Sequence, residues 1–306
     1  MAVSLYFSTS HLKVIVGSGD ANSVKVDDFA MFSLPEGAMI NGIITDEDAM
    51  IRYLTGIGTN MSLFKQEAML VIDNNSIRSK VMDLPSVPEA KLFEFISRDI
   101  GVVAEGGEVN DVFDYTVLNS KVEGGGSRIL AVAVDRDLLS TYRNTFASAG
   151  FNLKNINIGV NAANKIARVS PQLMTGARIL AIVDERNLTL MLYEGGDYKI
   201  TNKYRLFNSD DTAEWRQEIG NNISSVVQFH KGQRPSEEIS AAFFAGLSPA
   251  QTSALAEPLS FLGIQIGMLD LASRVKISSK AASKDGGLNP GKYLLNLGVM
   301  LKGKGA

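Results

Sequence analysis

The N-terminal residues alternate between apolar and polar side chains with the period of two that is typical of β-strands. Residues 1–7 follow this alternation, and the apolar residues of 12–16 and 24–32 predict a second and a third strand. The segments Ser8–His11 and Gly17–Asp20 separate them and are rich in the small polar residues that favour turns. The pattern therefore predicts a three-stranded meander at the start of the chain.

A second meander is predicted in the C-terminal half, from residues 179–183, 188–193 and 198–206. The segment after it is typical of an amphipathic helix, because its apolar residues recur at i, i+4, i+8, i+11 and i+12. These residues are Trp215, Ile219, Ile223, Val226 and Val227. A buried strand at 240–244, a helix at 251–262 and a closing helix at 293–301 complete this half.

Between the two meanders the pattern changes to helices mixed with short strands. Thr45 or Asp46 is expected to cap a helix that carries Met50 and Leu54 on one side. Asp135 is expected to cap another helix, which ends at Gly150. Further predicted elements are strands at 68–72, 77–82, 112–118 and 128–134, a helix around Leu92, Phe93 and Ile96, a turn at Gly124–Gly126, and a helix at 162–169.

A meander followed by a helix thus occurs twice, with an insertion in the first half. Periodicity alone predicts an α/β protein with two domains. The predicted division of the chain is a first lobe at 1–86, an inserted subdomain at 87–158, a return to the first lobe and a hinge at 159–176, a second lobe at 177–290, and a closing helix and tail at 291–306.

Composition excludes several classes of protein. The chain has 306 residues and no cysteine, which excludes disulfides, thiolate metal sites and a cysteine nucleophile. The formal net charge is −3, and Lys and Arg are scattered, so no nucleic-acid surface is expected. No secretory signal and no apolar run of membrane-spanning length is visible, so a cytoplasmic protein is expected.

Six segments, taken together, form a pattern of order and spacing that runs along nearly the whole chain. They are Leu34–Asp46, Asp83–Pro85, Ala131–Phe151, Glu218–Phe229, Phe244–Leu247 and Asn296–Leu301. In this order and spacing, they resemble the PilM family of type IV pilus assembly proteins.

The resemblance implies an actin-like, ribonuclease H-like fold with two lobes and a small α+β subdomain inserted in the first. It also implies a cytoplasmic adaptor of a pilus assembly platform. Such a protein would bind the N-terminal cytoplasmic tail of a PilN-like inner-membrane protein, in a groove beside the inserted subdomain. It would contact other platform or motor proteins, and it would lie at the inner face of the membrane only through its partner.

Actin-like ATPases hold nucleotide phosphates with two turns that normally contain an Asp and glycines. In the first turn of this chain, Tyr6 replaces the acid and Ser8 replaces the glycine. Thr9, Ser10 and Lys13 remain at positions that match the family pattern. This turn has therefore lost the residue types that approach magnesium and phosphate most closely.

The second turn keeps Asp184 and Thr189 but has Arg186 in place of a glycine, and it is shortened. The adenosine loop keeps Gly246. The candidate nucleotide-binding residues are Ser8, Thr9, Ser10, Lys13, Asp184, Thr189 and Gly246. Because phosphoryl transfer depends on positioning and charge, we expect weak or lost binding of ATP and Mg²⁺, no catalytic residues and a pseudo-ATPase.

Other features favour structural roles. His11 and His230 are expected to be solvated, and no spacing of ligands suggests a metal site. Alternative functions remain open: a nucleotide-gated ATP-binding protein of pilus assembly, or a component similar to FtsA or to the cytoplasmic part of GspL. A component similar to FtsA would be expected to end in an amphipathic helix, and one similar to GspL would be expected to continue into a membrane span. Neither segment is seen.

Overall fold

The structure is a computed structural model that describes residues 1–85, 89–101, 110–119, 126–284 and 286–302. The chain forms two compact units. Unit 1 comprises residues 1–32 and 162–306, and unit 2 comprises residues 33–161. The fold is mixed α/β, as the sequence predicts. Of the turn predicted at Gly124–Gly126, Gly124 and Gly125 lie outside the described residues.

The first sheet of unit 1 contains the predicted N-terminal meander. The strands that unit 1 contributes to this sheet are β1 (Ala2–Phe7), β2 (His11–Gly19), β3 (Val24–Ser33) and β16 (Val275–Ile277), which is parallel to β3. The predicted turn at Gly17–Asp20 is wrong in position, because β2 continues to Gly19. The chain turns just after it, where the Asp20 carboxylate accepts the backbone N–H groups of Asn22 and Ser23, both at 2.7 Å. The sequence did not indicate β16.

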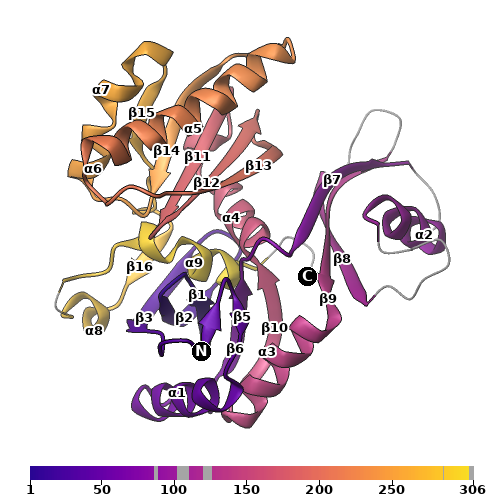
Figure 1. The fold of residues 1–306 in the computed structure, drawn as a ribbon, viewed down its shortest axis with the longest axis vertical. Coiled ribbons are helices and arrows are strands. Elements are labelled where there is room, and N and C mark those ends of the chain that lie inside the picture. Colours follow the sequence, from indigo (N-terminus) through magenta and orange to yellow (C-terminus); the bar gives the residue numbers. More distant parts are fainter. Residues whose placement is uncertain (86–88, 102–109, 120–125, 285, 303–306) are drawn as a thin grey trace. The chain divides into compact units, whose positions relative to one another are not determined.

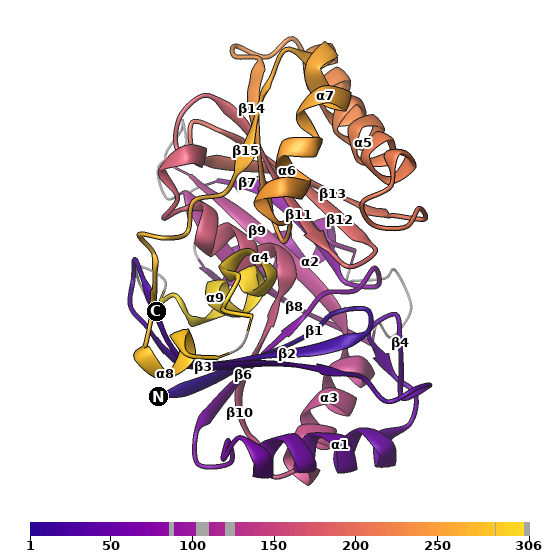
Figure 2. The same ribbon diagram turned by 90° about the vertical axis from the view of Figure 1, so that its left-hand side faces the viewer.

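The second sheet of unit 1 has the order β13-β12-β11-β14-β15. Its strands are β11 (Ala177–Asp184), β12 (Asn187–Glu194), β13 (Asp197–Arg205), β14 (Ile239–Ala245) and β15 (Gln265–Met268). The helix α5 (Ala213–Gly232) lies across one face of this sheet, as Figures 1 and 2 show. Its apolar stripe, with Trp215 1% exposed, forms the core with strand residues. The helix predicted around Trp215 is thereby confirmed.

The remaining helices of unit 1 are short. They are α4 (Gly159–Ala167), which starts in unit 2, α6 (Pro249–Ala254), α7 (Ala256–Leu259), α8 (Ser279–Ala282) and α9 (Leu294–Met300), with 3-10 turns η1 (Pro171–Leu173), η2 (Ser260–Leu262) and η3 (Pro290–Tyr293). The single helix predicted at 251–262 is broken into α6, α7 and η2, because Pro258 has no N–H to continue the ladder. Asn296 joins α9 to the first sheet, since its Nδ2 donates to the carbonyls of Ser4 at 3.1 Å and Lys13 at 3.0 Å.

Unit 2 combines a pair of parallel strands with a smaller sheet. Its elements are β4 (Met39–Ile40), β5 (Ile43–Ile44), α1 (Glu47–Asn60), β6 (Glu67–Ile72), β7 (Arg78–Leu84), α2 (Glu89–Asp99), β8 (Asp111–Asn119), β9 (Ser127–Asp135), α3 (Arg136–Ser148) and β10 (Asn152–Ile158). The predicted helix caps are confirmed: the Asp46 side chain accepts from Ala49 N, and that of Asp135 from Leu138 N. Figure 2 shows α1 and α3 near each other, and the two helices are in contact.

The small sheet of unit 2 has the order β7-β9-β8 and carries α2 on one face. We call β7, α2, β8 and β9 the inserted subdomain. Its core contains Ile96 and Ile129, both fully buried, with Phe113 packed against them. Because strand side chains alternate, Val132 and Val134 of β9 lie on the face opposite this core. The predicted inserted subdomain began at residue 87 and so left out β7. In the structure β7 pairs with β9 along its whole length, and we therefore include it.

Candidate functional site

The two turns that the sequence singled out lie against each other in unit 1. The first connects β1 to β2 through Ser8, Thr9 and Ser10. The second connects β11 to β12 and is only two residues long, since Asp184 and Asn187 face each other across it. The Asn187 side-chain amide donates to the Thr9 hydroxyl at 2.9 Å. The structure thus confirms the shortened second turn.

Asp184 and Lys13 form a buried ion pair at the base of these turns. The side chains of Lys13 and Asp184 are 4% and 12% exposed, and Lys13 Nζ donates to Asp184 Oδ1. The Tyr6 hydroxyl donates to the other carboxylate oxygen at 2.7 Å. Lys13 Nζ also donates to the Lys292 carbonyl at 2.9 Å. Both charges therefore have polar partners within the protein, which is the condition for burying an ion pair.

Glu185, which the sequence analysis did not select, is the centre of the second cluster. Its carboxylate accepts from the Ser8 hydroxyl at 2.7 Å, the Ser10 backbone N–H at 2.8 Å and the Ser10 hydroxyl at 2.9 Å. His11 Nδ1 lies 2.6 Å from the same carboxylate. Partial burial raises the pKa of Glu185, but the hydrogen bonds from His11, Ser8 and Ser10 outweigh it and hold this pKa below its ordinary value.

The remaining two candidate residues lie outside this network. Thr189 is in the interior of β12, between Ile182 of β11 and Lys203 of β13. Gly246 follows β14 with a φ of +94°, and a Cβ at this position would be 1.9 Å from the Val183 carbonyl oxygen. The backbone itself therefore requires glycine at Gly246, whether or not a nucleotide approaches it.

A magnesium-bound triphosphate does not fit the turns as they are arranged. Both carboxylate oxygens of Asp184 already accept hydrogen bonds, one from Lys13 and the other from Tyr6. The Tyr6 hydroxyl, which stands in place of an acid, is a poorer magnesium ligand than a carboxylate would be. The Ser10 N–H, which would face a phosphate, faces Glu185 instead. The Glu185 carboxylate also places a negative charge at this position, and that charge would repel a negatively charged phosphate.

Both histidines have protein partners, so the prediction that they are solvated is wrong. His11 is bonded to Glu185, and its side chain is 33% exposed. His230 is buried, and its Nε2 lies 2.8 Å from Glu194 Oε1. The sequence could not show either contact, because the partners are far away in the chain.

Unit 2 contains an apolar groove of about 390 Å³ between β8 and β10. β8 lies at the end of the small sheet, and β10 lies at the end of the sheet that contains β6. The apolar lining consists of Ile72, Val112, Phe113, Tyr115, Val132, Val134, Leu139, Ile156 and Ile158. Asp114, Thr116, Asn157 and Asn161 are polar residues at the same groove. Edge strands can pair with a further extended chain.

A second hollow, of about 310 Å³, shares Val112, Leu139 and Ile156 with this groove and continues it. It is more basic than the first, because Arg136 and Arg143 of α3 line it together with other residues of α3 and β10. We use the term tail groove for the two hollows together. The sequence predicted a partner surface in this region without naming its residues.

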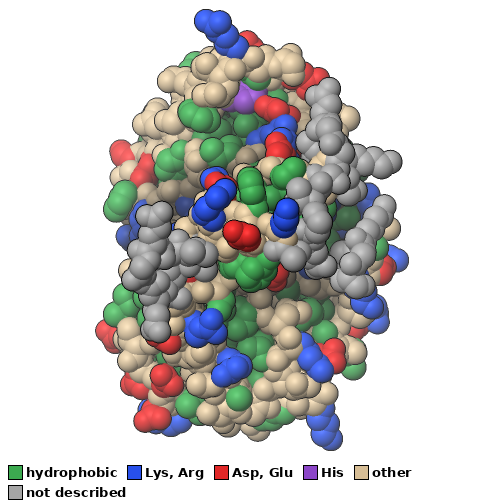
Figure 3. Space-filling model, turned by 90° about the vertical axis from the view of Figure 1, so that its right-hand side faces the viewer, with side chains coloured by type: hydrophobic (Ala, Val, Ile, Leu, Met, Phe, Trp, Pro, Cys, Tyr) green, Lys and Arg blue, Asp and Glu red, His purple; other side chains and the backbone are tan. Residues whose placement is uncertain are grey.

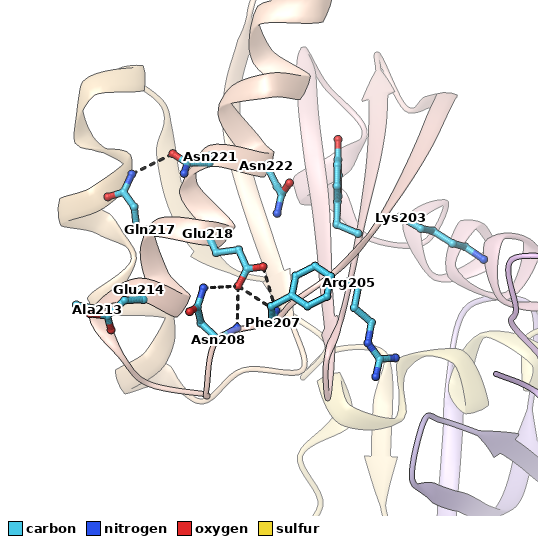
Figure 4. A pocket seen from close by; sticks show the side chains of 11 residues that line it. Lys203, Arg205, Phe207, Asn208, Ala213, Glu214, Gln217, Glu218, Asn221 and Asn222 are labelled. Carbon is cyan, nitrogen blue, oxygen red and sulfur yellow. Dashed lines mark hydrogen bonds between the residues drawn. The ribbon is translucent and has the colours of Figure 1, made fainter. Parts of the chain in front are cut away.

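A wide, open hollow of about 1040 Å³ lies between β13 and the first half of α5 in unit 1. Figure 4 shows Glu218 extending from α5 toward Phe207 and Asn208. The carboxylate accepts from the backbone N–H of Phe207 at 3.0 Å and from Asn208 Nδ2 at 2.9 Å. Glu218 therefore serves to hold the chain segment after β13.

We expect Glu218→Ala to lower the free energy of unfolding by about 1 kcal/mol, because it removes hydrogen bonds to Phe207 and Asn208 that water can partly replace. Urea unfolding followed by circular dichroism measures the change. Glu214→Ala is the matched control, since Glu214 lines the same hollow in the first turn of α5. Equal losses in the two variants would contradict this role for Glu218.

Neither a cluster of metal ligands nor a membrane-spanning helix is found among the residues that the structure describes. Within the described ranges, His, Asp and Glu form no group of three or more that could hold a metal ion. Among the helices that the structure describes, none has the length and hydropathy needed to cross a membrane. On the face in Figure 3, Lys and Arg side chains are scattered among Asp, Glu and hydrophobic groups.

Comparison with solved structures identifies the fold. A chain of the PilM–PilN type IV pilus biogenesis complex aligns with 98% of this chain and 97% of its own length, with a TM-score of 0.79 and 15% identity. A Bacteroides thetaiotaomicron protein of actin-like ATPase fold and unknown function aligns with 96% of this chain and 95% of its own, with a TM-score of 0.53 and 10% identity. Comparisons with family profiles and with curated proteins give no match. The chain has an actin-like fold, and its predicted resemblance to PilM is confirmed in structure.

Proposed function

We propose that this protein is a PilM-like adaptor of a type IV pilus assembly platform, which binds the N-terminal cytoplasmic tail of a PilN-like inner-membrane protein. The tail binds in the tail groove, and that partner holds the protein at the inner face of the membrane. Other platform or motor proteins contact the same assembly. The observation that carries the proposal is the tail groove itself, together with the structural similarity to the PilM–PilN complex.

The chemistry of the tail groove supports an extended peptide as the occupant. β8 and β10 are both terminal strands of their sheets, so their backbones can pair with an added strand. Alternate side chains of that strand would face the apolar floor formed by Val132, Val134 and Leu139. A groove of about 390 Å³ that is lined by residues of several strands suits an extended tail better than it suits a folded domain.

The arrangement of the two turns supports a second part of the proposal, which is that nucleotide use is lost. Lys13 and Asp184 pair with each other, and Glu185 accepts hydrogen bonds from Ser8 and Ser10. The protein then acts as a scaffold and not as an ATPase. A nucleotide-gated adaptor is the alternative, in which ATP would change the affinity for the tail.

We expect Val112→Asp to weaken binding of a PilN-type tail peptide by tenfold or more. Val112 lines both hollows of the tail groove, and a carboxylate there would lose hydration when the peptide covers it. Fluorescence anisotropy of a labelled synthetic tail peptide from the PilN-like protein of the same organism measures the dissociation constant.

Val117→Asp is the matched control, because Val117 lies on the same strand, is 43% exposed and does not line the groove. Its dissociation constant should stay within about twofold of that of the natural protein. Thermal unfolding of both variants reports whether they remain folded. Equal peptide binding by the natural protein and Val112→Asp would contradict the proposed location, and no binding by the natural protein would contradict the proposed partner.

A further inference from the structure

The β1–β2 turn presents a set of hydrogen-bond donors that suits an oxyanion. Ser10 contributes its backbone N–H and its hydroxyl, Ser8 contributes a hydroxyl, and His11 contributes Nδ1 when that nitrogen carries the proton. Backbone N–H and hydroxyl groups gathered on a turn are a common way to bind phosphate or carboxylate. These donors all meet the Glu185 carboxylate.

Glu185 reaches this position because of the shape of its own turn. The β11–β12 hairpin turns through only Glu185 and Arg186, and Glu185 has a φ of +55°. Glutamate rarely adopts this left-handed backbone conformation, because its Cβ then lies too close to the following carbonyl oxygen. The hydrogen bonds to Ser8, Ser10 and His11 compensate for the cost of that close contact.

We propose that Glu185 is an internal anion that occupies the oxyanion-binding donors of the β1–β2 turn and excludes the phosphoryl groups of external ligands from them. The inference deepens the proposed loss of nucleotide use and rests on that part of the proposed function. It is independent of the tail groove, whose residues lie in unit 2.

Tethering gives Glu185 an advantage over a free ligand. A group that is held in place acts at an effective concentration in the millimolar range or above. An external phosphate binds only to the fraction of molecules in which the carboxylate has moved away. Its apparent affinity is therefore the intrinsic affinity multiplied by that fraction. Asp184 and Lys13, which neutralise each other beside the turn, offer no additional attraction for an anion.

The same contacts join two sheets of unit 1 without a nucleotide. Glu185 and Asp184 belong to the second sheet, and the Ser8–Lys13 segment leads into the first. The Asn187 contact with Thr9 adds a neutral hydrogen bond between them. The carboxylate of Glu185 therefore replaces, within the chain, the phosphate that would otherwise link two such turns.

Titration calorimetry of Glu185→Ala with sodium tripolyphosphate, and separately with Mg-ATP, tests the proposal. We expect the variant to bind tripolyphosphate at least tenfold more tightly than the natural protein, since the donors are then vacant. The Mg-ATP titration distinguishes nucleotide from free polyphosphate as the better ligand. Equal affinities of the variant and the natural protein for tripolyphosphate would overturn the proposal.

Glu194→Ala is the matched control. Glu194 is also a glutamate beside a hairpin turn of the same sheet, and it also contacts a histidine, His230. Its replacement should leave tripolyphosphate binding unchanged, because its donors do not belong to the β1–β2 turn. A gain in this control equal to that in Glu185→Ala would show a general effect of removing negative charge and would overturn the proposal.

A measurement on the natural protein does not depend on the folding of a variant. We expect the side-chain carboxyl carbon of Glu185, followed by NMR, to titrate with a pKa below the ordinary glutamate value, as its hydrogen bonds to Ser8, Ser10 and His11 require. An ordinary pKa would mean that these contacts are absent in solution. Failure of the tail peptide to bind would leave this result unchanged, so the two proposals can fail separately.

Discussion

Replacing Lys13 by methionine should lower the free energy of unfolding by about 3–5 kcal/mol, because it leaves the buried Asp184 carboxylate without its cation. The side chains of Lys13 and Asp184 are 4% and 12% exposed, so water can replace only part of the lost interaction. The Lys292 carbonyl would lose its donor in the same variant. Urea unfolding without any nucleotide measures the effect.

Two comparisons isolate the cause. Lys13→Met combined with Asp184→Leu should recover much of the loss, since removing both charges of a buried pair is far less damaging than removing one. Lys80→Met removes the exposed ion pair between Lys80 and Asp99 and should cost less than about 1 kcal/mol. A stability of Lys13→Met within about 1 kcal/mol of the natural protein would contradict a structural role for the pair.

Replacing Gly246 by alanine should lower the free energy of unfolding by about 3 kcal/mol. The positive φ contributes about 1–2 kcal/mol, and the contact of the new Cβ with the Val183 carbonyl at 1.9 Å adds a similar amount. The carbonyl belongs to β11, whose end positions Asp184, so the backbone cannot move away without disturbing that end. The loss should appear without any ligand.

Gly263→Ala separates the two contributions. Gly263 has a φ of +65°, and nothing lies within 4 Å of a Cβ built on it. This variant should therefore show the conformational cost alone, about 1–2 kcal/mol. The same loss of stability in the Gly246 and Gly263 variants would contradict the close approach of Val183.

The sequence predicted the elements whose signals are local. The stripe around Trp215, the caps Asp46 and Asp135, and the strands of both meanders depend on periodicity and on turn chemistry within one segment. The position of the turn after β2 was missed because glycines at 17 and 19 resemble a turn. Within the strand, Gly17 instead allows close contact with the Lys25 carbonyl.

The candidate site was predictable only in part. Resemblance indicated Lys13 and Asp184, yet nothing in the sequence shows that they bind each other, because 171 positions separate them. Glu185 was missed because a glutamate in a short hairpin turn is an ordinary solvent-exposed residue until its tertiary partners are known. The tail groove depends on β8 and β10 lining the same hollow, which no local pattern encodes.

We propose above all that the protein binds the tail of a membrane partner and does so without ATP. Isothermal titration calorimetry of the natural protein with the tail peptide, in the absence and the presence of Mg-ATP, tests it most directly. We predict a dissociation constant for the peptide on the order of micromolar, unchanged by Mg-ATP, and no heat from Mg-ATP alone. Tight binding of ATP that changes the affinity for the peptide would contradict the account and identify a nucleotide-gated adaptor.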